Sequence, residues 1–181
     1  MKNNQKFETK SVRAGSIRSD QGEHSEALYL TSSFVFKNAK EAAARFGNQD
    51  EGNIYSRFTN PSVKMFEDRL SVLEGAEQCV ATSTGMSAIL ACIMSLCKAG
   101  DHIVVSKSVF GTTIKLFDNI LIKWGLQVTY VSLTDLSEWK NSVKNNTKLF
   151  FVETPSNPLT EICDIAALAD LAHTSKSLLV V

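Results

Sequence analysis

The sequence lacks an excess of charge of either sign and lacks any long apolar run. Among its 181 residues, 19 Lys and Arg stand against 19 Asp and Glu, so the formal net charge is zero. A balanced chain gives no electrostatic reason to expect a nucleic acid or an anionic membrane as partner. No apolar stretch is long and charge-free enough to cross a bilayer, and the start, MKNNQKFETKS, lacks the apolar core of a secretory signal. These absences predict a cytoplasmic protein with neither kind of partner.

Cysteine and histidine are both scarce, and neither is arranged as a metal site. The cysteines lie in apolar stretches without a CxxC pair, and the histidines are dispersed: Cys79, Cys92, Cys97, Cys163, His24, His102 and His173. A zinc site needs closely spaced thiolates and imidazoles. The cysteines are therefore interpreted as small buried hydrophobes in a reducing compartment, and no metal site is expected.

The order of apolar patterns predicts the fold class. From Pro61 onward, helical and strand patterns alternate without an internal repeat or a low-complexity tract. The sequence predicts helices over 61–75, 85–100, 112–125, 135–146 and 164–176, and strands over 78–84, 102–108, 127–133, 148–155 and 177–181. Strands separated by helices of this length predict an α/β fold with a mostly parallel sheet, flanking helices and ligands at the strand carboxyl ends.

The helix boundaries have recognisable capping residues. Asn60 and Pro61 mark the start of the first helix, and Gly75 marks its end. Asp135 and Asp164 are expected to cap two later helices.

Two apolar stretches predict burial. The helix over 85–100 is apolar nearly all round, which predicts a buried helix ending at Gly100. The closing run Leu178–Val181 has the apolar, β-branched character of a strand buried on both faces. Natural domains rarely end inside such a strand, so the sequence predicts a truncated domain.

Residues 1–60 differ from the rest of the chain. They show no clean periodicity and few turn signals, which predicts an extended N-terminal arm distinct from residues 61–181. Within the arm, the stretch NAKEAAARFGNQDEGN predicts one short helix followed by a polar, Gly-containing loop.

The stretch ATSTGMSAI joins a strand end, a glycine and a helix start. Free backbone N–H groups and the positive dipole end at such a start make an anion site. Gly85 would let a ligand approach the backbone closely, and Thr84 can cap the helix or donate its hydroxyl. An ordinary N-cap and tight turn explains the same residues. One glycine is too few for a GxGxxG or Walker motif.

Two more strand ends carry candidate residues. Phe110, in SVFGTT, suits stacking on a flat ligand, but a core phenylalanine explains it equally well. In VETPSNPL, Glu153, Ser156 and Asn157 stand beside two prolines whose preceding bonds impose a rigid path that allows a cis bond. A Pro-rich turn is the alternative. A buried Glu153 must be paired or hydrogen-bonded, which favours a functional role.

A fourth candidate lies in the arm, in NIYSRFTNPS. Tyr55 and Arg57 are separated by one residue, so in an extended segment both point the same way. A phenol beside a guanidinium suits a phosphate. A pair of surface residues is the alternative.

Together, the motifs YSRFTNPS, ATSTGMSAI and VETPSNPL resemble those of the Cys/Met metabolism family of pyridoxal-phosphate-dependent enzymes, the cystathionine γ-synthase group. The resemblance covers essentially the whole chain. It implies fold type I of the pyridoxal-phosphate-dependent transferases, with pyridoxal 5'-phosphate held at the strand ends.

The resemblance also implies individual cofactor-binding roles. The cofactor phosphate would be held by Thr84 and by the backbone of Gly85 and Met86. Phe110 would stack on the pyridine ring, Asn157 would contact the phenolic oxygen of that ring, and Glu153 would support these cofactor-binding residues. Tyr55 and Arg57 would reach the phosphate of a neighbouring subunit's cofactor.

Within the family, EHSEALYLTSSFVF, GNIYSRFTNPS and SVFGTT look most like the branch of methionine biosynthesis that adds sulfide to O-succinylhomoserine, giving homocysteine. Most of the family has tyrosine where this chain has Phe110, and a phenyl ring moves no proton. Succinate leaves as a stable carboxylate and needs little acid assistance, whereas a thiolate needs more. Phe110 therefore agrees with an acyl-homoserine substrate. Transsulfuration by a cystathionine γ-synthase, with cysteine as the sulfur donor, stays open.

In the family, the run LLVV precedes an aspartate that pairs with the pyridinium nitrogen, the lysine that forms the Schiff base, and a substrate-binding arginine in a C-terminal domain. The resemblance thus implies that this chain is the N-terminal part of such an enzyme, without catalytic residues of its own and inactive alone. It implies a homotetramer in which residues 1–60 reach a neighbouring subunit. The alternatives are a catalytically dead remnant and a Rossmann-like nucleotide binder, which the lack of GxGxxG disfavours.

Overall fold

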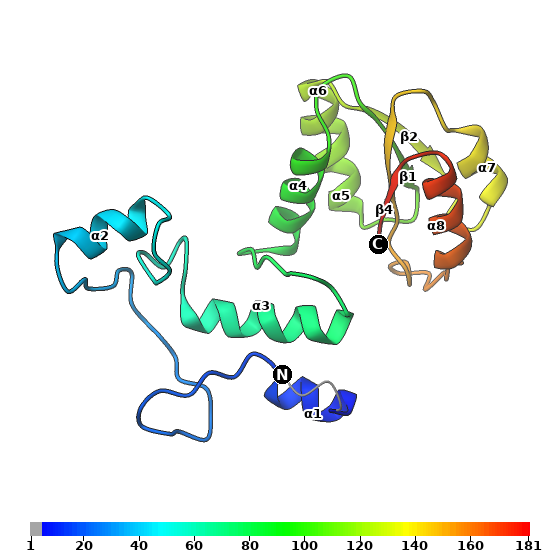
Figure 1. Ribbon diagram of the computed structural model, residues 1–181. Helices are drawn as coiled ribbons and strands as arrows, with labels where there is room; N and C mark the ends of the chain where they lie inside the picture. Colours follow the sequence, from blue (N-terminus) through cyan, green and yellow to red (C-terminus); the bar gives the residue numbers. More distant parts are fainter. Residues whose placement is uncertain (1–4) are drawn as a thin grey trace. The chain divides into compact units, whose positions relative to one another are not determined.

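The computed structural model describes residues 5–181, which form two compact units on either side of the Ala81–Thr82 bond. The N-terminal unit contains three helices (Figure 1): α1 Phe7–Arg13, α2 Ala39–Phe46 and α3 Pro61–Glu74. The expected division after residue 60 differs from this one because α3 packs against α1 and so joins the first unit. Helix α1 lies in the segment that was expected to be extended.

Helix α3 has the predicted boundaries. The side chain of Asn60 accepts a hydrogen bond from the Ser62 N–H, Pro61 occupies the first turn, and Gly75 ends the helix in the left-handed conformation. Its apolar side chains are only partly covered, because Val63 and Phe66 are 42% and 56% exposed. The predicted short helix of the arm is α2, and a polar loop follows it as expected.

The C-terminal unit is a parallel α/β layer structure, as predicted (Figure 1). Its strands are β1 His102–Ser106, β2 Gln127–Val131, β3 Thr147–Phe151 and β4 Leu178–Val180. Every neighbouring pair in the order β2-β1-β3-β4 is parallel. The helical segments are α4 Gly85–Leu96, α5 Gly111–Leu116, the π-helical turn η1 Phe117–Leu121, α6 Ile122–Trp124, α7 Leu136–Asn141 and α8 Ile165–Thr174.

Alternating side chains of the sheet build two separate cores. Ile103 and Val105 of β1 belong to one core, together with buried residues of α4, α5 and η1. Val104, between them, belongs to the other core, which includes Trp139 of α7 and Leu168 of α8. The sheet is therefore covered on both faces, which is the arrangement that parallel strands require.

Three predictions about individual elements were wrong. Residues 78–84 form no strand, because no strand in the described part of the chain pairs with them. Helix α4 ends at Leu96 rather than Gly100, and of its residues only Ile93 is buried. The helix predicted over 112–125 begins at Gly111 and is interrupted by η1.

The closing run forms strand β4, as predicted. β4 is the last strand of the sheet order and pairs only with β3 in the described residues. One of its edges therefore stays open, and Leu178 and Val181 are 51% and 60% exposed.

A buried histidine lies in the sheet. His102 is fully buried, and its Nδ1 and Nε2 atoms each lie 2.8 Å from a hydroxyl oxygen, of Thr147 and Thr129 respectively. Burial, with a smaller contribution from the charge of Lys144, lowers the pKa of His102 to about 4.

Among residues 5–181, no helix has the length and apolar character needed to cross a membrane.

Candidate functional site

The N-terminus of α4 presents unpaired backbone donors. Thr84 caps the helix, its Oγ1 accepting a hydrogen bond of 3.0 Å from the Ser87 N–H. Within the described residues, the N–H groups of Gly85 and Met86 donate to no protein acceptor. A Cβ added at Gly85 would meet no atom within 4 Å, so open space adjoins the start of the helix. The arrangement fits a phosphate group, because two N–H donors and the positive helix end face open space.

Phe110 is not a core residue. It directly precedes α5, and the residue is 48% exposed. Its backbone is nevertheless fixed, because its carbonyl oxygen accepts from the Thr113 N–H at 2.8 Å and its own N–H donates to Glu153 Oε2 at 2.9 Å. This exposure argues against a core phenylalanine, and stacking of the ring on a ligand stays a prediction.

Glu153 is hydrogen-bonded, as expected for a carboxylate at this position. A second glutamate, Glu161, makes a similar contact with the same turn. Glu153 follows β3 and accepts from the N–H of Phe110, in the turn after β1. Glu161, in the same loop after β3, accepts from Ser108 Oγ at 2.8 Å, in the same turn after β1. Two carboxylates therefore link the loop after β3 to the turn after the adjacent strand β1.

Asn157 lies in a tight loop closed by Ser156. The N–H of Ser156 donates to the carbonyl oxygen of Glu161, and the Glu161 N–H donates to Ser156 Oγ, both at 3.0 Å. Ser156 is buried, whereas Asn157 is exposed. The bonds before Pro155 and Pro158 are both cis, in line with the expected non-helical path. The amide of Asn157 is thus presented to solvent by a rigidly closed loop.

Tyr55 and Arg57 lie close together in the N-terminal unit, although not through the predicted geometry. Tyr55 pairs with Ser33 in an isolated antiparallel bridge, so this position is extended. The chain then turns, because the N–H groups of Phe58 and Thr59 donate to the Tyr55 carbonyl oxygen at 2.8 and 3.0 Å. The Arg57 guanidinium lies 5.3 Å from the Tyr55 ring and lines an open hollow of about 550 Å³. The guanidinium lies equally close to the Phe58 ring, at 5.3 Å, so the turn rather than strand alternation places Arg57 beside Tyr55.

In the C-terminal unit, the predicted site residues gather at one end. The N-terminal ends of α4 and α5 and the loop after β3 lie at the same end of this unit (Figure 1). This is the end at which parallel strands place their ligands. Tyr55 and Arg57 form a separate group in the other unit.

Sequence reasoning missed Ser108 and Glu161. They are 53 residues apart, and neither stands in a local pattern of its own. Only the adjacency of β1 and β3 places their loops side by side.

The donors, ring and amide of the C-terminal unit fit a flat, phosphorylated aromatic cofactor. The N–H groups at Gly85 and Met86 suit its phosphate. The exposed ring of Phe110 suits its aromatic face, and the amide of Asn157 suits a polar ring substituent.

Comparison with known proteins agrees with this fit. The sequence profile of the Cys/Met metabolism PLP-dependent enzymes matches residues 8–181. The chain is 59% identical over 175 residues to O-succinylhomoserine sulfhydrylase of Pseudomonas aeruginosa, covering 97% of this chain and 43% of that protein. It is 40% identical over 167 residues to L-methionine gamma-lyase of Treponema denticola, covering 92% of this chain and 42% of that protein. The chain thus spans less than half the length of these relatives.

Solved structures share the fold. One described as an O-acetylhomoserine (thiol)-lyase of Campylobacter jejuni, which carries a pyridoxyl-lysine phosphate, has a TM-score of 0.90 at 30% identity, covering 97% of this chain and 44% of that one. Cystathionine gamma-lyase of Lactobacillus plantarum, in complex with L-serine, has a TM-score of 0.86 at 34% identity, covering 97% of this chain and 44% of that one. The fold is that of pyridoxal-phosphate-dependent enzymes, pyridoxal 5'-phosphate is the cofactor, and the chain belongs to the Cys/Met metabolism PLP-dependent enzyme family.

Proposed function

We propose that the protein is a γ-replacement enzyme of methionine biosynthesis, which adds sulfide to O-succinylhomoserine and gives homocysteine and succinate. The observation that carries the proposal is that Phe110 has a phenyl ring rather than a phenol. The residue is exposed at the same end of the C-terminal unit as the backbone N–H groups of Gly85 and Met86, which would bind the phosphate. The 59% identity to an O-succinylhomoserine sulfhydrylase supports the choice of substrate.

We assign the cofactor contacts of the C-terminal unit to the residues gathered at one end of it. Thr84 and the N–H groups of Gly85 and Met86 would bind the phosphate, Phe110 would cover the ring, and Asn157 would bind the ring oxygen. When bound, pyridoxal 5'-phosphate supplies an electron sink for the substrate carbons. Glu153 positions Phe110 through its backbone N–H.

Tyr55 and Arg57 are assigned to the phosphate of a neighbouring subunit's cofactor. In support, both side chains are exposed, and the guanidinium has no carboxylate partner within the described residues. A free guanidinium beside a phenol suits a phosphate. We therefore propose a cytoplasmic homotetramer with shared active sites.

The covalently bound lysine and the residues that transfer protons are assigned to the part of the relatives that this chain does not span. The term full-length protein means these 181 residues together with the remaining length of the relatives. A catalytically dead, shortened form is the alternative, and the reading frame beyond the codon for Val181 distinguishes the two.

The substrate test offers the full-length protein O-succinylhomoserine with sulfide, with cysteine and with no sulfur donor, and in a separate assay methionine alone. We expect homocysteine from sulfide at the highest kcat/KM. Cystathionine formed preferentially from cysteine would make the protein a cystathionine γ-synthase. Cleavage of methionine at a comparable rate would instead place it with the gamma-lyases, one of which is 40% identical. Such cleavage is disfavoured because Phe110 cannot protonate a leaving thiolate.

A further inference from the structure

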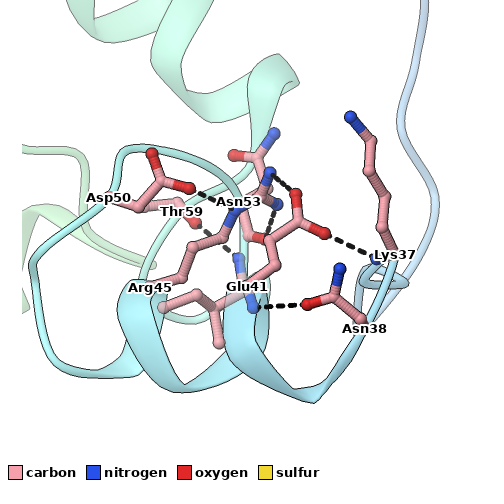
Figure 2. Close-up of polar contacts among 8 residues, drawn as sticks. Lys37, Asn38, Glu41, Arg45, Asp50, Asn53 and Thr59 are labelled. Carbon is pink, nitrogen blue, oxygen red and sulfur yellow. Dashed lines mark hydrogen bonds and ion pairs between the residues drawn. The ribbon is translucent and has the colours of Figure 1, made fainter.

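The loop between α2 and Tyr55 folds around one guanidinium group. Arg45 stands in the last turn of α2, and its Nη2 atom lies 2.7 Å from Glu41 Oε1 on the same helix. Its Nη1 donates to the carbonyl oxygen of Asn53 at 3.4 Å, and its Nε lies 3.9 Å from Asp50 Oδ2. Figure 2 shows these partners converging on the guanidinium from the helix and from the loop. The guanidinium therefore joins α2 to the stretch of chain that leads to Tyr55.

Gly52 shows how closely the loop approaches. A Cβ at this position would lie 2.5 Å from Arg45 Cζ and 2.6 Å from Nε, and the φ of +150° is itself unfavourable for other residues. The backbone of the loop thus passes directly against the guanidinium, and only glycine leaves room for it. The ion pair with Glu41 is largely shielded, since the side chains of Arg45 and Glu41 are only 20% and 15% exposed.

The remaining neighbours fix Arg45 in place. Its guanidinium lies 5.8 Å from the centre of the Phe36 ring, on the segment that precedes α2. Glu41 is held in turn, because its Oε2 accepts from the Lys37 N–H at 2.5 Å and its own N–H donates to Asn38 Oδ1 at 2.9 Å (Figure 2). These contacts form a capping arrangement at the start of α2. The guanidinium therefore has one defined position from which to bind the loop.

The loop bound by Arg45 is directly connected to the turn that carries Tyr55 and Arg57. Asn53 is two residues before Tyr55, and the intervening Ile54 donates its N–H to Thr59 Oγ1 at 3.3 Å, across the turn that contains Arg57. We propose that Arg45 is a positioning residue, which fixes the turn that carries Tyr55 and Arg57 by binding residues 50–53. This inference rests on the proposed function, in which Tyr55 and Arg57 bind the cofactor phosphate.

The test compares Arg45→Ala, Arg45→Lys and Arg57→Ala in the full-length protein. Amide hydrogen exchange of residues 47–59 is measured on the apoprotein, and the Kd for pyridoxal 5'-phosphate is measured by titrating that apoprotein. Arg45→Ala should speed exchange in residues 47–54 and raise the Kd by about tenfold, the size expected for losing a residue that supports a ligand-binding one. Arg45→Lys should resemble Arg45→Ala, because an ammonium cannot bind helix and loop together as a guanidinium does.

The matched control is Lys40→Ala. Lys40 is an exposed cation on the same helix and makes no hydrogen bond or ion pair to the loop among the described residues, so exchange and Kd should both stay unchanged. The double variant Arg45→Ala/Arg57→Ala should weaken cofactor binding by less than the two single effects combined, because Arg45 acts in part through Arg57 and such residues are not additive.

The outcomes separate the two proposals. Unchanged exchange in residues 47–54 of Arg45→Ala would overturn the role of Arg45, as would full recovery in Arg45→Lys or an additive double variant. An unchanged Kd in Arg57→Ala would overturn the assignment of Arg57 to the phosphate. The exchange measurement would still decide whether Arg45 organises the loop.

Discussion

The backbone N–H of Phe110 and the Oε2 atom of Glu153 lie 2.9 Å apart, in a hydrogen bond between the ends of the neighbouring strands β1 and β3. The contact leaves the phenyl ring exposed while it restrains the backbone that carries the ring. The backbone from which the ring extends is therefore held in place before any ligand binds, and such preorganisation lowers the cost of ordering this turn on binding.

Removing that acceptor should loosen the site. Glu153→Ala is expected to lower the free energy of unfolding of the full-length protein by roughly 1–3 kcal/mol, because a bond to a charged acceptor is lost. Urea unfolding, with the Kd for cofactor measured alongside, checks this. Asp170→Ala, an exposed carboxylate on α8, is the control and should change stability by less than about 0.5 kcal/mol. Equal losses in both variants would contradict a specific role for Glu153.

Adding a hydroxyl to the exposed ring should change the chemistry more than the binding. Phe110→Tyr is expected to leave the Kd for pyridoxal 5'-phosphate nearly unchanged, because the ring still stacks. It should raise cleavage of thiolate-releasing substrates such as methionine, because a phenol can donate a proton. Cofactor titration and a methionine cleavage assay check the two parts. Loss of cofactor in this variant would contradict the stacking assignment.

His102 makes stability depend on pH. Its folded pKa is about 4, whereas an unfolded histidine ionises near pH 6.5. The unfolded state therefore binds the proton first, so the stabilising contribution is complete above pH 6.5 and is lost as pH falls toward 4. It amounts to roughly 3 kcal/mol. Urea unfolding at several pH values should show a slope in this window that is reduced in His102→Gln and retained in the exposed control His173→Gln.

The 181 residues alone should not bind cofactor covalently, because none of their lysines stands in a motif that resembles the family's Schiff-base lysine. The isolated chain is mixed with pyridoxal 5'-phosphate, reduced with borohydride and mapped for modified lysines. Scattered, substoichiometric labelling without turnover of O-succinylhomoserine is the expected result. One lysine labelled stoichiometrically, with turnover, would reverse the conclusion.

Local signals in the sequence were enough to predict local structure. The side chains of Asn60, Asp135 and Asp164 accept backbone hydrogen bonds at the starts of α3, α7 and α8, as expected. A cap acts within three residues, so its geometry is already contained in a short stretch of sequence. The parallel sheet followed from the alternation of helices and strands, because a helix between two strands provides the crossover that parallel pairing needs.

The features that escaped prediction depend on residues that are far apart in the chain. The stretch 78–84 has strand-like composition, but a strand also needs a hydrogen-bonded partner, and none pairs with it within residues 5–181. The same holds for Ser108 and Glu161, whose contact exists only because two loops meet at the sheet edge. The exposed ring of Phe110 was also undecided, because a phenylalanine after a strand suits a core equally well.

Gly85 has a consequence for engineering this protein. No atom of the described chain would collide with a methyl group there, so folding alone gives no reason to keep glycine at the start of α4. Replacing a glycine by alanine where the backbone permits it commonly adds roughly 0.4–1 kcal/mol of stability. A campaign that ranks variants by melting temperature would therefore favour Gly85→Ala, and the added methyl group would adjoin the place proposed for the phosphate. Selection for heat resistance and selection for cofactor retention are expected to pull this one position in opposite directions.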